Sequence, residues 1–174
     1  MKTENLVFLD EMGVLLGSMR TRGRSQKGQR AYDIKPFYRG KRITVMGAMT
    51  QNSLLAIKTI DQGMNGQNFQ QFLKEELAPN LWKGAVVVMD NLPAHKVDGV
   101  KQIIENVGAR VIYLSPYSPE FNPIEHLWSQ LKIFLRQFGP KTHKAVEQLL
   151  NIALMLSNPE HFRNWFAHCC YCTN

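Results

Sequence analysis

Hydrophobic residues in the first part of the chain occur in short stretches, which are typical of β-strands. These stretches cover residues 6–9, 43–48 and 54–60. A polar turn at residues 50–53 separates the last two, so we expect them to form a hairpin. The pattern then changes to the 3.6-residue period of a helix, which runs from residue 63 to Pro79.

The middle of the chain alternates between strand and helix patterns. Residues 85–89 form a continuous apolar run, as expected for a strand buried on both faces. A helical pattern over residues 97–107 follows, and residues 110–114 return as a strand. Such crossovers join parallel strands, so we predict an α/β fold: a mixed five-stranded sheet, with three antiparallel strands first and parallel additions afterwards, flanked by helices.

The last part of the chain is predicted to be helical. Two prolines exclude a helix or central strand from residues 115–123. Asn122 and Pro123 are residues that start helices, and the apolar stripe that follows ends at Gly139. Further helices are expected within residues 141–170, and the length of 174 residues suits a single domain.

Charge is unevenly distributed along the chain. Residues 20–42 contain nine basic side chains and one acid, although the whole chain has a net charge of only +7. A basic block on a nearly neutral body indicates a localised contact with a polyanion. No apolar run approaches the ~18 residues of a membrane helix, so we expect a cytoplasmic protein.

Three cysteines lie within the last six residues, at Cys169, Cys170 and Cys172. They form no disulfide framework, which fits a reducing compartment. The paired spacing of a structural zinc site would require a second pair elsewhere in the chain, and the sequence has none. We therefore interpret them as reduced thiols near a frayed terminus.

Three acidic residues occupy positions suited to chemistry. Asp10 follows the first predicted strand, Asp90 follows the buried strand, and Glu125 stands in the first turn of the helix after the prolines. Each alone has an ordinary explanation, because Asp is common in turns and Glu at helix starts. Together they are candidates for a cluster of oxygen ligands that holds a pair of Mg²⁺ ions for phosphoryl transfer.

Three segments around these acids resemble the acidic motifs of DDE transposases. They are VFLDE at residues 7–11, VMDNLPAH at 88–95 and LSPYSPEFNPIE at 114–125. The resemblance is narrowest to the bacterial insertion-sequence branch of the mariner superfamily, because 34 residues separate Asp90 from Glu125, as in its D-D-34-E pattern.

This resemblance implies an RNase H-like catalytic fold that cleaves DNA at transposon ends and transfers the cut strand to a target. It implies Asp10, Asp90 and Glu125 as ligands of two Mg²⁺ ions, for which Mn²⁺ can substitute. The implied partners are double-stranded DNA and, by analogy with paired transposon ends, a second copy of the chain. The implied location is the cytoplasm of a prokaryotic cell, with association to the nucleoid when the protein is bound to DNA.

The family usually carries a helix-turn-helix region before the first catalytic strand, whereas Met1 here precedes that strand by a few residues. We therefore expect either a second reading frame, joined to an upstream product that carries the helix-turn-helix, or a truncated remnant. Two alternatives to a transposase stay open: an RNase H-like nuclease that does not join DNA, and a catalytically silent DNA-binding remnant.

Basic side chains are candidates for contacts with the DNA backbone. Lys132 and Arg136 share a predicted helix face with Glu125, although an ordinary solvated face would look the same. The basic block contributes Arg20, Arg22, Arg24, Lys27, Arg30, Lys35, Arg39, Lys41 and Arg42. Tyr32, Phe37 and Tyr38 lie among them and are candidates for stacking on bases or for packing a hairpin.

Residues close to the acids are candidates for supporting roles. His95 suits either positioning of the scissile phosphate or attacking water, or ordering of its loop, and Asn91 suits ordering of the turn. We place Glu11 outside the site, because neighbouring strand residues point to opposite faces. His126 lies about 100° around the helix from Glu125, so it would act only indirectly.

Overall fold

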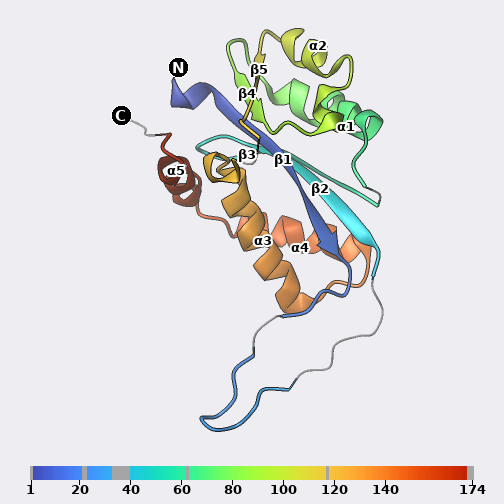
Figure 1. Cartoon of the computed structure of the whole chain (residues 1–174), viewed down its shortest axis with the longest axis vertical. Coiled ribbons are helices and arrows are strands. Elements are labelled where there is room, and N and C mark those ends of the chain that lie inside the picture. The colour runs from blue at the N-terminus through green and yellow to red at the C-terminus, as the bar shows by residue number, and fades with distance from the viewer. Residues whose placement is uncertain (1, 21–22, 33–39, 62, 117, 172–174) are drawn as a thin grey trace.

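The computed structural model describes residues 2–20, 23–32, 40–61, 63–116 and 118–171. Within them a five-stranded sheet has the strand order β3-β2-β1-β4-β5 (Figure 1). Its strands are β1 (Leu6–Leu15), β2 (Arg42–Met49), β3 (Leu54–Ile60), β4 (Val86–Met89) and β5 (Arg110–Tyr113). The α-helices are α1 (Gly66–Phe72), α2 (Val100–Glu105), α3 (Ile124–Phe138), α4 (His143–Met155) and α5 (Pro159–His168).

Strand directions follow the predicted pattern. β2 pairs antiparallel with both β1 and β3, whereas β4 pairs parallel with both β1 and β5. The predicted α/β fold, with antiparallel strands first and parallel strands added, is therefore confirmed.

Alternation along β1 creates two separate cores. Phe8, Met12 and Val14 face one side of the sheet and pack among apolar residues of α3, α4 and α5. Val7 and Leu9 face the other side and pack among residues of α1 and α2. Figure 1 shows the two helix groups on opposite sides of the sheet.

β1 is longer than predicted, because it continues past Asp10 to Leu15. Backbone pairing with β2 extends from Phe8 to Leu15 and does not depend on hydrophobic side chains. β4, in contrast, pairs only with Leu6, Val7 and Phe8. Asp10 therefore lies within a strand, just beyond the end of its parallel neighbour, where α/β sheets commonly place ligands.

Some helix boundaries differ from the prediction. The helix expected from residue 63 to Pro79 is α1 followed by a π-helical turn at Leu73–Leu77. The next helix is regular only over Val100–Glu105. α3 ends as predicted at Gly139, whose φ of 55° is a left-handed value that glycine adopts readily. In the described part of the chain, no helix has both the length and the apolar character that a membrane span requires.

Candidate active site

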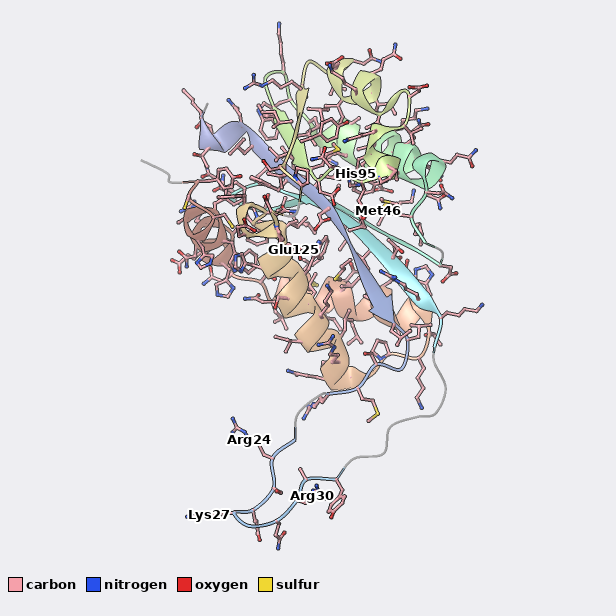
Figure 2. All side chains as sticks on the ribbon, viewed as in Figure 1. Arg24, Lys27, Arg30, Met46, His95 and Glu125 are labelled. Atoms are coloured by element: carbon pink, nitrogen blue, oxygen red, sulfur yellow. The ribbon has the colours of Figure 1, made fainter. Side chains whose placement is uncertain are left out.

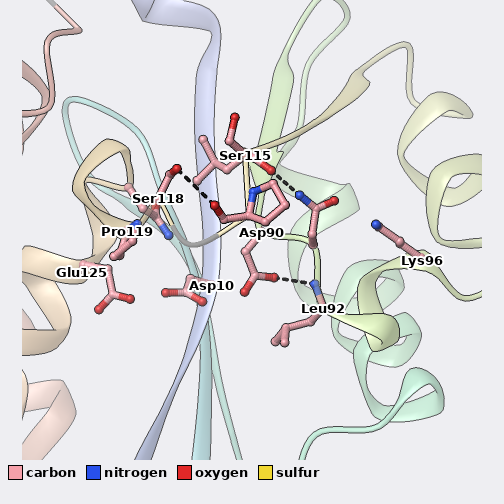
Figure 3. A pocket seen from close by; sticks show the side chains of 12 residues that line it. Asp10, Asp90, Leu92, Lys96, Ser115, Ser118, Pro119 and Glu125 are labelled. Carbon is pink, nitrogen blue, oxygen red and sulfur yellow. Dashed lines mark hydrogen bonds between the residues drawn. The ribbon is translucent and has the colours of Figure 1, made fainter.

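The three acidic residues singled out by the sequence line one cavity of about 730 Å³ (Figure 3). Asp10 comes from β1, Asp90 directly follows β4, and Glu125 lies in the first turn of α3. Figure 3 shows the carboxyl group of Asp10 between those of the other two. Three segments far apart in the sequence thus present their carboxyl groups to a common space.

Asp10 is the buried member of this group, with 7% of its surface exposed. Burial, together with the nearby negative charges of Glu11, Glu125 and Asp90, raises the pKa of Asp10 to about 8. Both causes penalise the charged form of the carboxyl group. A cation bound in the cavity would relieve this penalty.

Trp128 fixes the orientation of Asp10. The indole N–H donates a hydrogen bond to Asp10 Oδ2 at 3.2 Å, and the Trp128 side chain is fully buried. Its ring edge lies against Gly47, the β2 residue opposite Asp10 in the sheet. A Cβ atom at Gly47 would lie 2.6 Å from the Trp128 ring, so only glycine leaves room for the indole there.

We expect Gly47→Ala to lower the free energy of unfolding by about 1–3 kcal/mol, because the added methyl group overpacks the space that Trp128 occupies. Urea unfolding followed by circular dichroism would measure the loss. Gly63→Ala is the matched control, since a Cβ there meets no atom within 4 Å. Equal stabilities of the two variants would contradict the close fit of Gly47 to Trp128.

Asp90 is held by groups from its own loop. The Leu92 backbone N–H donates to Asp90 Oδ1 at 3.0 Å, and His95 Nδ1 lies 2.7 Å from the same oxygen. Burial alone would raise the pKa of Asp90, but these two hydrogen bonds outweigh it and lower the pKa below its usual value. Asp90 therefore stays ionised under conditions in which Asp10 holds a proton.

His95 is completely buried, so it contacts the cavity only through Asp90. Burial alone would lower the pKa of His95, but the carboxyl groups of Asp90 and Glu11, one at each ring nitrogen, raise it to about 9. Of the two roles predicted for His95, this geometry favours ordering of the loop over direct contact with phosphate or water. Asn91 has a related place, because its side-chain N–H donates to the Leu114 carbonyl and ties together the loops after β4 and β5.

Glu125 is exposed at the open side of the cavity. Asn122, three residues earlier, is 4% exposed and also lines the cavity. Its side-chain oxygen has no hydrogen-bond partner among the residues that the structure describes. Asn122 is thus a further polar residue in the wall of the site, which the sequence pattern had indicated only as a helix start.

The donor set suits a hard divalent cation. Carboxylate oxygens are the ligands that Mg²⁺ and Mn²⁺ prefer, and the negative charge crowded around buried Asp10 is what such an ion would neutralise. Within the ranges that the structure describes, no three acidic, histidine or cysteine side chains are already close enough to hold a metal ion together. The carboxylates face a common space without enclosing it.

Lys96 is a cavity residue that the sequence reasoning missed. It lines the same cavity as the acids (Figure 3). Its ammonium group lies 5.6 Å from the centre of the Tyr113 ring. No periodic pattern marks Lys96, because it lies in a short 3₁₀ turn, Pro93–Lys96. Lys96 lines the acidic cavity because of the conformation of this turn, which the sequence pattern does not predict.

Lys132 and Arg136 line a separate, smaller cavity of about 230 Å³. It lies between the second half of β1 and α3, with Gly13 and Ser18 also in its wall. The two cations therefore follow Glu125 along α3, as their shared face predicted, but they do not line the acidic cavity.

None of the described cations of the basic block lines the acidic cavity. Figure 2 shows Arg24, Lys27 and Arg30 on a loop that projects from the sheet. The described cations of the block are all exposed: Arg20, Arg24, Lys27, Arg30, Lys41 and Arg42. Arg22, Lys35 and Arg39, like Phe37 and Tyr38, lie outside the described residues. Tyr32 is 86% exposed, so it does not pack the root of a hairpin.

The end of the chain is better packed than predicted. Cys169 is buried, and burial raises the pKa of its thiol. Tyr171 donates a hydrogen bond to the Phe121 carbonyl at 3.0 Å, so the tail is held in place as far as this residue. Cys170 is exposed, and Cys172 lies outside the described residues.

His126 faces α5 rather than the acids. Its ring stacks on Trp165 at 6.5 Å and meets His168 edge-on at 4.9 Å. Burial and the nearby His168 lower its pKa. As predicted from the helix geometry, it takes no direct part in the acidic cavity.

The fold and the acidic cavity define a nuclease-like class of α/β protein, and comparison identifies the family. Residues 5–149 match the family described as DDE superfamily endonuclease. The chain belongs to this family. The matched segment contains Asp10, Asp90 and Glu125.

Individual relatives support this assignment. The Tc1 transposase of Caenorhabditis elegans is 27% identical over 97 residues, which cover 53% of this chain and 36% of that protein. The Tcb1 transposase of Caenorhabditis briggsae gives the same identity and coverage. The chain thus matches only about a third of the length of these relatives.

Solved structures show the fold. A Mos1 transposase paired-end complex with the left transposon end has a TM-score of 0.80 at 19% identity, and the match covers 96% of this chain and 52% of the Mos1 chain. A Mos1 mariner paired-end complex with Mn has a TM-score of 0.81 at 19% identity, with 96% and 53% coverage. The predicted RNase H-like fold is therefore confirmed.

Proposed function

We propose that this chain supplies the catalytic domain of a DNA transposase, which cuts DNA at the ends of a mobile element and joins the freed 3′ hydroxyl to target DNA. The placement of Asp10, Asp90 and Glu125 in one cavity carries the proposal. Membership of the DDE superfamily endonucleases and likeness to proteins described as transposases support it. Its substrates would be double-stranded DNA, as transposon ends and as target, in the cytoplasm of a prokaryotic cell.

Asp10, Asp90 and Glu125 would hold two Mg²⁺ ions, with Mn²⁺ as a substitute. Mos1 structures are described both with Mn and with Mg, which supports a divalent ion here. Bound ions of this kind activate a nucleophile and stabilise the leaving oxygen. The chain itself provides rigid placement: β1 and Trp128 hold Asp10, the Leu92 N–H and His95 hold Asp90, and α3 carries Glu125.

Cations on two sides of the acids would bind the DNA backbone. Lys96 lines the acidic cavity itself, and Lys132 and Arg136 line the smaller cavity further along α3. The exposed cations of the basic block would extend this contact. Contacts with phosphates position a duplex without reading its sequence, so they would serve any target DNA.

Replacing both Lys132 and Arg136 with alanine is expected to weaken DNA binding and to lower the slope of log affinity against log salt by about 2, because each phosphate contact contributes about 0.9. Fluorescence anisotropy of a labelled duplex over a salt series would measure this slope. The matched control replaces Lys74 and Lys101, two exposed cations beside α1 and on α2, with the same change in charge. Equal slopes for the two double variants would mean that DNA affinity depends on the net charge of the protein and not on phosphate contacts by Lys132 and Arg136.

Two partners belong to the proposal. A second copy of the chain would allow two DNA ends to be held at once, as the description of Mos1 in paired-end complexes suggests. An upstream reading-frame product with a helix-turn-helix would supply recognition of the ends. Light scattering with and without end DNA would measure the oligomeric state, and a single-copy complex with paired ends would contradict the dimer.

A joining reaction tests the function itself. Pre-cut transposon-end DNA, a target plasmid and Mg²⁺ are mixed with the chain, with and without the upstream product. Joined DNA is the expected outcome. Nicked DNA without joined product would favour a nuclease that does not join DNA. If the chain gives no reaction and the Asp90→Asn variant binds DNA as tightly as the wild type does, the silent DNA-binding remnant would be favoured.

A further inference from the structure

We propose that Glu11 and His95 are positioning residues that hold Asp90 in place from the opposite face of the sheet. The inference rests on the proposed function, because it concerns a carboxylate that would bind the metal ions. It assigns a role to Glu11, which the alternation of β1 alone places outside the site.

His95 lies between two carboxyl groups. Its Nδ1 is 2.7 Å from Asp90 Oδ1, and its Nε2 is 3.3 Å from Glu11 Oε2. The imidazole is completely buried, and its centre lies 4.4 Å from the centre of the Phe69 ring. A ring with a carboxyl group at each nitrogen and an aromatic ring against its face has a defined orientation.

The backbone around His95 is also fixed. Tyr113 of β5 donates a hydrogen bond to the His95 carbonyl at 3.0 Å. The His95 N–H donates to the Leu92 carbonyl at 3.0 Å. The backbone that carries the imidazole is therefore held in place, and Glu11 of β1 faces its Nε2 atom.

Burial of the Glu11 carboxylate favours its contact with the imidazole. Its Oε2 atom is buried and has no well-formed hydrogen bond within the described residues, so its ion pair with His95 is the contact that offsets its loss of hydration. An unpaired buried carboxylate is strongly unfavourable. Without the imidazole, the buried Glu11 carboxylate would have no opposite charge beside it. Without Glu11, the Nε2 atom of His95 would lose its charged partner.

The arrangement links two acids through one rigid strand. Asp10 and Glu11 are consecutive residues of β1 and point to opposite faces of the sheet. Asp10 faces the cavity directly, and Glu11 contacts Asp90 through His95 beyond the end of β4. β1 therefore sets the position of Asp90 relative to Asp10, which is the distance that a pair of metal ions would depend on.

Glu11 does not itself line the acidic cavity. Its side chain is 16% exposed and borders a separate cavity of about 430 Å³ on the other side, with Gly13 and Arg42 in its wall. Glu11→Gln keeps the shape and one hydrogen-bond acceptor, whereas Glu11→Ala removes the contact. Glu11→Gln therefore tests the negative charge alone, and Glu11→Ala tests the charge together with the side-chain contact.

Calorimetric titration of the DNA-free chain with Mn²⁺ tests the inference. We expect the dissociation constant to rise in the order wild type, Glu11→Gln, Glu11→Ala, and to reach about 10–100 times the wild-type value, as for residues that orient metal ligands elsewhere. In DNA cleavage, the Mn²⁺ concentration for half-maximal rate should rise by a similar factor, with the rate at saturating Mn²⁺ within about threefold of wild type. Glu105→Gln, an exposed carboxyl group on α2, is the control with the same change of charge.

Three results would overturn the inference, and they differ from one another. Wild-type Mn²⁺ affinity in Glu11→Ala, alongside weakened binding in Asp90→Asn, would refute positioning by Glu11 and leave the metal site intact. A lower melting temperature of Glu11→Gln with unchanged Mn²⁺ affinity would make Glu11 a structural residue only. A wild-type chain that binds no Mn²⁺ would remove the proposed metal site and the positioning role with it.

Discussion

Glu125→Gln is expected to reduce metal-dependent DNA strand cleavage by about 10³-fold and to leave the fold as stable as before. Glutamine preserves the size of the side chain but replaces a charged metal ligand with a neutral amide. Loss of about 4 kcal/mol of transition-state stabilisation corresponds to this factor. Because Glu125 is exposed at the start of α3, its side chain adds little to the packing of the core.

Single-turnover cleavage of a pre-nicked transposon-end duplex in Mg²⁺ would measure the rate, and urea unfolding would measure the stability. Glu160→Gln is a matched control, since Glu160 is also an exposed acid in the first turn of a helix, α5. Retention of more than about a tenth of the rate in Glu125→Gln, a loss of less than about 1.4 kcal/mol, would exclude Glu125 as a metal ligand in the reaction.

The metal-free protein is expected to lose stability as pH rises, and Asp10→Asn is expected to abolish most of that loss. The pKa of Asp10 is raised from 3.8 to about 8 in the folded chain. Between these values the folded state keeps a proton that the unfolded chain has released, so rising pH favours unfolding. At about 1.4 kcal/mol per pKa unit, the loss over this whole pH range is on the order of 6 kcal/mol.

Unfolding by urea in EDTA at pH 5 and pH 8 would measure this effect. We expect Asp10→Asn to be the more stable protein at pH 8, since the amide stays neutral and its oxygen still accepts the Trp128 hydrogen bond. His95, with its pKa raised to about 9, adds a decline of the same sign that both proteins share. Asp98→Asn, at an exposed acid, is the control.

Addition of a divalent metal ion is expected to increase the free energy of unfolding, whereas rising pH decreases it. Mg²⁺ or Mn²⁺ at pH 8 should raise the stability of the wild type, because ligands that bind only the folded state stabilise it. Asp10→Asn should gain much less. Parallel pH profiles for wild type and Asp10→Asn would mean that Asp10 ionises normally in the folded chain.

Local pattern was sufficient for most of the fold. The apolar run at Val86–Met89 is a strand buried on both faces, and the stripe of Ile124, Leu127 and Trp128 is the buried face of α3. Both depend on periodicity, which is a property of neighbouring residues. β1 was predicted too short for the same reason: Asp10 and Gly13 interrupt the apolar pattern, whereas pairing with β2 holds the strand to Leu15.

The candidate site was predictable only in part. The three acids follow from their places next to strands and a helix start, together with their family motifs. Lys96 was missed, because nothing in its local pattern indicates that the Pro93–Lys96 turn brings it to the cavity. Trp128 belongs to the apolar stripe of α3 that periodicity predicts, but its hydrogen bond to Asp10 depends on the position of α3 against the sheet.

The sequence by itself determined the class of fold, the identity and spacing of the three acids, and the face of β1 on which Asp10 and Glu11 each lie. Only the tertiary structure decided that Trp128 orients Asp10 and that His95 connects Glu11 to Asp90. Periodicity specifies which way a side chain points relative to its own element. What lies opposite that side chain depends on how distant segments pack, and it is this packing that sets the distances on which hydrogen bonds and charge interactions depend.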